Sequence, residues 1–378
     1  MKILIQIIYP LKKLIYPAGI YSIKQEVTLL NKIIFKDARI TRPQDNQIEQ
    51  IKNLFPVISP VKKGDIVAIK IHPGEYGNTT HVRPVVVRTI VDMVLKEGGI
   101  PFVTDTTTLY TGMKLNAAEL IQGAAMNGFT HASMNAPFIV ADGLRGGDGK
   151  EIKINGEVLD SITVASGIAE ADSMIVISHG KGHPASGFGG AVKHLGMGCL
   201  DRAGKIKVHE VGRPSIDPEK CIRCGDCVEI CPWGAIEPPL IDHSKCCGEL
   251  SCADACQQEA IIPPQDASEK MQKRLGEAAS GPIRALDGRI GYLNWVYDLT
   301  PGCDCFNFSG ERFVEDIGML AGTDPVAVDA ATIDLINERM KINGKSIRHV
   351  WGIDPAVHLE AAEKIGCGSR KYSFGDGN

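Results

Sequence analysis

Eight of the twelve cysteines in this 378-residue chain lie in two short, adjacent runs. The first run is Cys221, Cys224, Cys227 and Cys231, and Pro232 follows it directly. Cysteines separated by two, two and three residues and closed by proline are typical of loops that bind iron–sulfur clusters, in which the fourth cysteine ligates a second cluster. The spacing therefore predicts redox metal chemistry, and with it electron transfer.

The second run consists of Cys246, Cys247, Cys252 and Cys256. Compared with the first run, cysteines take the first, third and fourth positions, Glu249 takes the second position, and Cys247 is an additional thiol. One of the two clusters therefore needs a fourth ligand from outside the usual positions.

In two-cluster ferredoxins the last cysteine of each run ligates the cluster of the other run. This rule gives two ligand sets in the present chain. One 4Fe–4S cluster would be held by Cys221, Cys224, Cys227 and Cys256. The other cluster would use Cys231, Cys246 and Cys252, together with Cys247 or Glu249. Cys247 would give a second 4Fe–4S cluster, which we favour, whereas loss of the second-position cysteine is a way to make a 3Fe–4S cluster.

Zinc and disulfides explain the two runs less well. Zinc sites use separated pairs of ligands, typically four in total. Disulfides belong to oxidising compartments, and the chain has no convincing secretory signal. We therefore expect an anaerobic, cytoplasmic protein whose cysteines bind metal.

Reactive side chains also surround a glycine-rich loop at residues 187–190, which follows a predicted strand and precedes a helix. This order of elements binds anions at the helix N-terminus, so Gly187, Gly189 and Gly190 are candidate cofactor-binding residues. Lys193 and the histidines near it offer proton carriers, nitrogen ligands and a point of covalent attachment. These candidate groups are His179, Lys181, His183, Lys193, His194 and His209.

An upstream segment, residues 70–84, joins this candidate site because it follows the end of another predicted strand, where open parallel sheets bind ligands. It contains His72, Glu75, His81 and Arg83, and Arg83 could hold a carboxylate with two hydrogen bonds.

A third group of thiols consists of Cys303 and Cys305, with Cys199 far away in the sequence. Two cysteines one residue apart point to opposite faces of a strand but can converge in a turn. We expect either a further metal or redox chemistry here, and the alternative is that these are small buried hydrophobic residues.

The elements that must position these groups alternate along the chain. Predicted strands at 66–71, 101–104, 173–178 and 289–297 alternate with helices at 86–96, 116–126, 267–279 and 326–340, and a small hairpin at 151–158 turns at Asn155 and Gly156. Repeated strand–helix units predict an α/β fold with mostly parallel sheets flanked by helices.

Proline-rich joints divide the chain. We expect a poorly ordered extension at 1–31, with a membrane-surface anchor as an alternative, and an α/β domain with the glycine-rich loop at 32–213. A ferredoxin-like α+β insert with two clusters would cover 214–265, and a C-terminal α/β segment 266–378.

The net charge of −4 is unevenly distributed. Residues 215–262 carry nine acidic side chains against three basic ones, which suits docking on a basic redox partner such as another protein of electron transfer. No basic stripe indicates nucleic-acid binding, and no apolar stretch is long enough to predict a transmembrane helix.

Several segments together resemble the family of uncharacterised Fe–S center proteins, known as domain of unknown function 362, from about Lys32 to about Cys367. The resemblance rests on VAIKIHPGEYGNTTHVRP, GHPASGFGGAVKHLGMGCLDRAGK, the cysteine-rich insert, TPGCDCFNFSG and DIGMLAGTDPVAVDAA. It implies a type of protein and not a reaction.

The glycine-rich loop is also distantly similar to that of the nickel-pincer lactate racemases. In that family a histidine precedes a lysine by ten residues, with Gly-Phe-x-Gly between them, and a second histidine follows sixteen residues later; His183, Lys193 and His209 have these spacings. The resemblance implies that Lys193 attaches the cofactor, His209 binds nickel and His183 acts as an acid–base residue.

The Arg83–Pro84 pair is similar to the substrate loop of the same racemases. Thr80 and Val82 stand where that family has Asp and Thr, and the racemases lack the cysteine-rich insert.

We therefore predict an iron–sulfur oxidoreductase in which the insert passes electrons to or from a catalytic site of Arg83, His183, Lys193 and His209. Its partners would be a ferredoxin, a flavodoxin or a redox enzyme, with a small-molecule substrate. Two alternatives stay open: an electron-transfer subunit without its own substrate, and a nickel-pincer hydroxy-acid racemase or epimerase.

Overall fold

The structure, a computed structural model, describes residues 31–341 and 344–375. The predicted extension at 1–31 lies outside the described residues except for Asn31. In the described part of the chain, no helix combines the length and the apolar character needed to cross a membrane.

One eight-stranded sheet with the strand order β16-β1-β15-β14-β7-β2-β3-β4 runs through the described residues. Neighbours are parallel from β14 through β7, β2 and β3 to β4, and β1 is parallel to β16, whereas β15 is antiparallel to both of its neighbours. The predicted α/β fold with a mostly parallel sheet is thereby confirmed. The strands are β1 (Asn31–Asp37), β2 (Ile66–Lys70), β3 (Ile100–Asp105), β4 (Phe138–Val140), β7 (Ser173–His179), β14 (Ile290–Val296), β15 (Gly318–Gly322) and β16 (Tyr372–Phe374).

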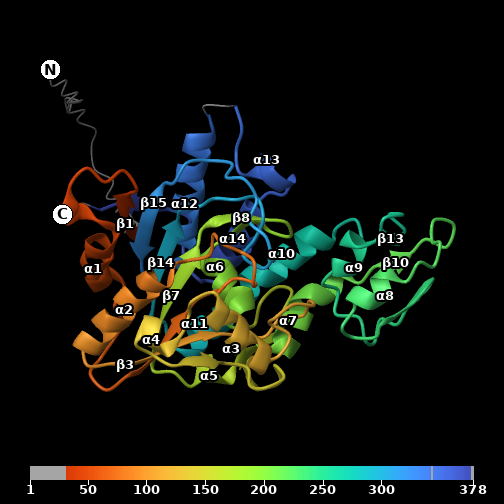
Figure 1. Ribbon diagram of the computed structural model, residues 1–378, viewed down its shortest axis with the longest axis horizontal. Helices are drawn as coiled ribbons and strands as arrows, with labels where there is room; N and C mark the ends of the chain where they lie inside the picture. Colours follow the sequence, from red (N-terminus) through yellow and green to blue (C-terminus); the bar gives the residue numbers. More distant parts are fainter. Residues whose placement is uncertain (1–30, 342–343, 376–378) are drawn as a thin grey trace, which may run out of the picture. The chain divides into compact units, whose positions relative to one another are not determined.

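Helices cover both faces of this sheet (Figure 1). On β14, Leu293 and Trp295 belong to the hydrophobic cluster with α1 and α2, while Tyr292 and Val296 belong to the larger cluster on the other face. Burial on both faces explains why the central strands are almost continuously apolar. The covering helices are α1 (Gln47–Ile58) and α2 (Pro84–Lys96) on the first face, and α6 (Ala191–Lys193), α10 (Ala267–Ala278), α12 (Pro325–Met340) and α14 (Ala356–Lys364) on the second.

Local sequence signals account for the ends of these helices. Pro84 occupies the first turn of α2, and the chain leaves that helix through Gly98, which has a φ of 84°. The side chain of Asn116 accepts hydrogen bonds at the start of α3 (Ala117–Met126), and that of Asp201 does so at the start of α7 (Arg202–His209). Shorter helices are α4 (His131–Met134), α5 (Ser166–Ala169), α11 (Ser280–Ala285) and α13 (Arg348–Trp351).

The predicted small hairpin is wider than expected. β5 (Gly149–Lys153) pairs with β6 (Ser161–Ala165), so Asn155 and Gly156 lie in a longer connection and not in a two-residue turn. The carboxylate of Glu277 in α10 explains the difference, because it accepts hydrogen bonds from the backbone N–H groups of residues 157–159 at 2.8–3.1 Å.

The cysteine-rich residues 214–265, hereafter the cysteine module, are built from very short elements (Figure 1). Within the module, the hydrophobic cluster of buried residues consists of Cys227, Ala235, Ile236 and Ile261. β10 and β13 pair with each other, so the chain enters and leaves the module side by side. Its elements are β10 (Ser215–Ile216), α8 (Asp226–Ile230), β11 (Ile236–Glu237), β12 (Leu240–Ile241), α9 (Ser251–Asp254) and β13 (Ile261–Ile262).

Candidate functional site

Charged side chains gather beyond the carboxyl ends of the central parallel strands, where open α/β sheets bind ligands. Asp105, the last residue of β3, is almost fully buried between two ammonium groups: Lys70 Nζ lies 2.8 Å from Oδ1, and Lys114 Nζ lies 2.9 Å from Oδ2. Burial alone would raise the pKa of this carboxyl group, but Lys114 and Lys70 hold it well below its usual value. Asp105 is therefore an anion that binds two cations.

A second buried carboxylate, Asp304, lies in the loop after β14. It pairs with His179 Nδ1 at 2.9 Å and with the ammonium group of Lys181. The other ring nitrogen of His179 lies 2.7 Å from the carbonyl oxygen of Tyr297. Asp304 thereby fastens the loop that carries Cys303 and Cys305 to the end of β7.

The glycine-rich loop forms a small hairpin in which β8 (Lys181–His183) pairs with β9 (Gly187–Gly189). A Cβ atom at Gly187, where φ is 72°, would lie 2.7 Å from the carbonyl oxygen of Ile353. A Cβ atom at Gly190 would collide with the carboxylate of Asp329. These two glycines therefore allow close approach within the protein.

A carboxylate of the chain itself binds the N-terminus of α6. Asp329 accepts hydrogen bonds from the backbone N–H groups of Ala191 at 2.8 Å and Val192 at 2.9 Å. We expected an external anion at this position, and the chain fills it with its own carboxylate. Gly189 has different neighbours from Gly187 and Gly190. A Cβ atom there would lie 3.5 Å from Lys193 Cδ and 4.0 Å from His183 Cβ.

Lys193 acts on the pKa values of both His183 and His209. Burial lowers the pKa of His209 to about 4, with Lys193 as the next cause. Burial also holds the pKa of His183 well below its usual value, and Lys193 and His209 contribute. The pKa of Lys193 itself is lowered to about 8 by burial and by Lys114, Lys70 and Lys181.

Arg83, the fourth predicted catalytic residue, has other partners. Its guanidinium group lies 2.8 Å from the carboxylate of Asp298 and 5.8 Å from the ring centre of Trp295, which belongs to the cluster on the α1 and α2 face. A free, substrate-binding Arg83 beside Lys193 stays a prediction.

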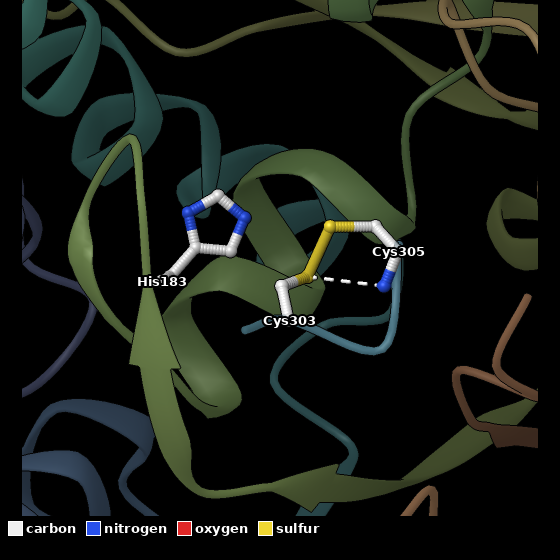
Figure 2. Close-up of side chains that lie close together, drawn as sticks. All are labelled: His183, Cys303 and Cys305. Atoms are coloured by element: carbon white, nitrogen blue, oxygen red, sulfur yellow. Dashed lines mark hydrogen bonds between the residues drawn. A yellow bond between two sulfur atoms is a disulfide. The ribbon is translucent and has the colours of Figure 1, made fainter. Parts of the chain in front are cut away.

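The sulfur atoms of Cys303 and Cys305 are joined as a disulfide, with their Cα atoms 5.1 Å apart. The convergence expected for a turn is thus observed. One ring nitrogen of His183 and the two sulfur atoms all lie within 4.8 Å of one another (Figure 2). Three such side chains could hold a metal ion if the two cysteines were reduced.

Cys199 behaves as a buried hydrophobic residue. Its side chain is inaccessible to solvent, and burial raises the pKa of the thiol to about 12. A neutral thiol at this position fits the packing alternative.

The cysteine module contains two cavities, and each gathers one of the predicted ligand sets. The first cavity is lined by Cys221, Cys224, Cys227 and Cys256. The second is lined by Cys231, Cys246, Cys247, Cys252 and Glu249. The last cysteine of each run therefore lines the cavity that contains the other cysteines of the opposite run.

The second cavity lies against the loop between β3 and α3. This loop also contributes to the group of charged side chains around Asp105 and Asp304, hereafter the charged site, whose members are Lys70, Glu75, Asp105, Lys114, His179, Lys181, Lys193 and Asp304. Leu109, in the loop between β3 and α3, lines this cavity, and its carbonyl oxygen accepts a hydrogen bond of 2.9 Å from Trp233 Nε1. The same loop carries Lys114, and Thr111 donates a 2.8 Å hydrogen bond to the carbonyl oxygen of Ile230. On another side, Gly248 approaches the backbone of His209 so closely that a Cβ atom would collide with its carbonyl oxygen.

Sequence reasoning missed the residues that hold the site together, which are Asp105, Lys114 and Asp329. All three have buried charged side chains. Each lies at or beyond the end of a strand or near the start of a helix, and this position is the signal that could have identified them. Asp105 was the most visible, since it ends an apolar run.

A family model described as a domain of unknown function (DUF362) matches residues 67–334. The chain belongs to this family. The match confirms the family resemblance and includes the charged site and the cysteine module of this DUF362 protein. No curated protein matches the chain.

Two solved structures are similar to this DUF362 protein. One is a protein from Thermotoga maritima, with 11% identity and a TM-score of 0.42, covering 79% of this chain and 60% of that one. The other is the lactate racemase apoprotein from Thermoanaerobacterium thermosaccharolyticum, with 12% identity and a TM-score of 0.40, covering 82% of this chain and 62% of that one. The chain thus spans 60% and 62% of the lengths of these two proteins.

Proposed function

We propose that this DUF362 protein is an iron–sulfur oxidoreductase whose cysteine module exchanges electrons with a site formed by Lys193, His183 and His209. The observation that carries the proposal is the crossover in the module. Cys256 of the second run lines the first cavity, and Cys231 of the first run lines the second. That exchange of the last cysteine is the pattern of two-cluster ferredoxins.

The first cavity suits a cluster because its four thiols are mutual neighbours. Burial raises the pKa of Cys227, and the nearby thiols of Cys224, Cys256 and Cys221 raise it further. Thiols packed this closely repel one another once ionised, which a bound iron cluster would compensate. When bound, the two clusters would supply one-electron transfer at potentials tuned by their surroundings.

Cys247 is the better fourth ligand in the second cavity. Glu249 is engaged within the module, because one of its carboxylate oxygens accepts hydrogen bonds from the backbone N–H and the hydroxyl of Ser251 at 3.1 and 2.5 Å. Cys247 is a free, buried thiol in the same cavity. With Cys231, Cys246 and Cys252 it would complete four sulfur ligands.

The loop between β3 and α3 supports contact between the module and the charged site. Tyr110 lies in this loop, and its pKa is held well above its usual value by burial and by Glu75, Asp105 and Glu249. Glu75 and Asp105 belong to the charged site, whereas Glu249 belongs to the second cavity. Tyr110 therefore interacts with carboxylates of both regions.

The charges of the site favour a small anionic substrate. Four lysines at or near the site, Lys70, Lys114, Lys181 and Lys193, face two paired carboxylates, Asp105 and Asp304. Within the part of the chain that the structure describes, Lys193 forms no ion pair with a carboxylate. An ammonium group with a pKa of about 8 can bind an anion, carry a proton or act as a nucleophile near neutral pH.

Metal analysis of protein purified without oxygen tests the proposal. We expect about eight irons per chain, with Cys227→Ala and Cys252→Ala each losing one cluster in electron paramagnetic resonance spectra of the reduced protein. Cys367→Ala, a buried thiol outside the module, is the control and should keep both. Zinc in place of iron, or a full iron content in both variants, would contradict the proposal.

A second candidate, a nickel-pincer racemase, is favoured by one observation. Lys193 and His209 are close enough for Lys193 to lower the pKa of His209, and these residues would attach the cofactor and bind nickel in that function. The same metal analysis separates the candidates: about one nickel per chain, lost in Lys193→Ala, would favour the racemase. Lys193→Ala with both iron clusters intact and no nickel in the parent protein would favour the oxidoreductase.

A further inference from the structure

We propose that Cys303 and Cys305 form a redox-active disulfide, which accepts two electrons and becomes a dithiolate stabilised by the charged site. The source of the electrons rests on the proposed function, in which the cysteine module delivers them one at a time. In the balanced step the sulfur–sulfur bond breaks, and each sulfur gains one electron and one negative charge, so the product is the dithiolate and no proton is taken up.

The two sulfur atoms differ in their surroundings. Cys303 is buried, with 7% of its surface exposed, whereas Cys305 is partly exposed. The backbone N–H of Cys305 donates a hydrogen bond of 3.2 Å to Cys303 Sγ (Figure 2). After the disulfide opens, this N–H would stabilise negative charge on Cys303.

His183 is arranged to do the same for the other sulfur. The backbone N–H of Ala185 donates a hydrogen bond of 3.1 Å to His183 Nδ1. Nδ1 is therefore without a proton, and the single proton of the neutral ring is on Nε2. Figure 2 shows Nε2 on the side of the ring that faces the sulfur atom of Cys305. His183 can thus donate a hydrogen bond to a thiolate at Cys305.

The lysines supply the remaining positive charge that would stabilise the thiolates. Lys181 pairs with Asp304, the residue between the two cysteines, and it is also one of the charges that act on His183, together with Lys193. With Glu75, on which Lys114 acts, the site contains four lysines and three carboxylates, so one positive charge is in excess. Negative charge on the sulfur atoms would lie within this excess of positive charge, so reduction is favoured by its surroundings.

The loop is held in place independently of the disulfide. Asp304 is 2% exposed, and its backbone oxygen accepts a hydrogen bond of 2.8 Å from the N–H of Glu75. The indole N–H of Trp351 donates a hydrogen bond of 2.7 Å to the carbonyl oxygen of Pro301. Both cysteines therefore stay close together after reduction, which allows the bond to form again.

The first experiment measures the redox state of this pair alone. Protein is equilibrated in mixtures of reduced and oxidised dithiothreitol without oxygen and then alkylated, and the peptide that carries Cys303 and Cys305 is analysed by mass spectrometry. We expect a single reversible transition from no alkylated cysteine to two. Two thiols that stay reduced under all conditions would overturn the proposal, as would a metal ion bound in stoichiometric amount and lost in Cys305→Ser.

A matched pair of variants tests the role of His183. His183→Gln should lower the ratio of reduced to oxidised protein about tenfold at a given dithiothreitol mixture, because a hydrogen bond to a charged sulfur is lost. His131→Gln, an exposed histidine in α4, should leave the ratio unchanged. An unchanged ratio in His183→Gln would overturn the assigned role of His183.

The source of electrons is tested separately. In protein whose module has been reduced with dithionite and freed of excess reductant, the pair should become reduced, and Cys252→Ala should slow this step at least tenfold while its response to dithiothreitol is kept. If dithiothreitol reduces the pair but the module contains no iron, the proposed function fails and the redox-active disulfide stands. If the module is loaded but the pair never changes, the disulfide proposal fails alone.

Discussion

The cysteine module and the Cys303–Cys305 loop both gather sulfur atoms, but they hold them by different means. In the module the thiols lie on short turns around a core of four buried residues. The Cys303–Cys305 loop is held by buried charges from other segments, since Asp304 pairs with Lys181 and His179 more than 120 positions away. A small core usually needs a bound metal for stability, so we expect the module to depend on the iron proposed for it, whereas the loop should not depend on a metal.

The largest expected effect follows from removing the iron. Backbone amides of residues 215–262 should lose hydrogen-exchange protection by a factor on the order of a thousand, because their local core is too small to stay folded alone. Amides of β7 and β14, which are paired in the centre of the sheet, are the internal control and should keep their protection. Equal loss in both regions would remove the distinction between them.

The buried ion pairs of the loop can be broken directly. Asp304→Asn leaves Lys181 without its carboxylate partner in a buried position, so the free energy of unfolding should fall by about 3–5 kcal/mol. The matched control is Asp92→Asn, whose partner Arg88 lies on the exposed surface of α2, with an expected change of about 0.5 kcal/mol or less. Similar losses in the two variants, measured by chemical denaturation, would contradict a special role for the buried pair.

We expect a fall in pH to destabilise the α/β part around the sheet more than the cysteine module. His358 is inaccessible to solvent, and burial lowers its pKa to about 3, with Lys193 as the next cause. The unfolded chain binds a proton at this residue below pH 6.5 and the folded chain does not, so stability is lost as the pH falls from 6.5 towards 3.

The variant His358→Gln isolates this contribution. Below about pH 6 the parent protein should lose about 1.4 kcal/mol more stability per pH unit than the variant does. Parallel pH profiles of the unfolding free energy would show that His358 does not carry the effect. His349→Gln, an exposed histidine, should have the profile of the parent.

The smallest expected effect lies inside the module. Cys247→Ala should lose about one iron from the second cavity and give the spectrum of a three-iron cluster. Unchanged iron content and spectra would exclude Cys247 as a needed ligand. Glu249→Ala would then be expected to lose the iron in its place.

The sequence made the module far more predictable than the charged site. Cysteine spacing is local, so both thiol sets could be proposed before any fold was known. The charged site depends on strand order: Lys70 and Asp105 meet because β2 and β3 are neighbours, although 35 positions separate them. Asp329 binds the start of α6 across 138 positions, and no local pattern indicates such a contact.

The same reasoning applies to the sheet. Its central strands are apolar on both faces and were predicted within a few residues of their observed ends. β15 was not predicted, because Gly318–Gly322 is short and contains two glycines, which are poor strand formers. This strand is also the one that runs antiparallel to both neighbours, and it is the exception within the mostly parallel sheet that the repeating strand–helix pattern predicts.

The pairing of β10 with β13 has a consequence for how such proteins can change. Ser215 lies opposite Ile262, so the two ends of the module are neighbours across a strand pair, about 5 Å apart. One or two residues would bridge that gap. The module can therefore be gained, lost or exchanged between α7 and α10 without altering the path of the chain through the sheet, so the cysteine module and the charged site can evolve separately.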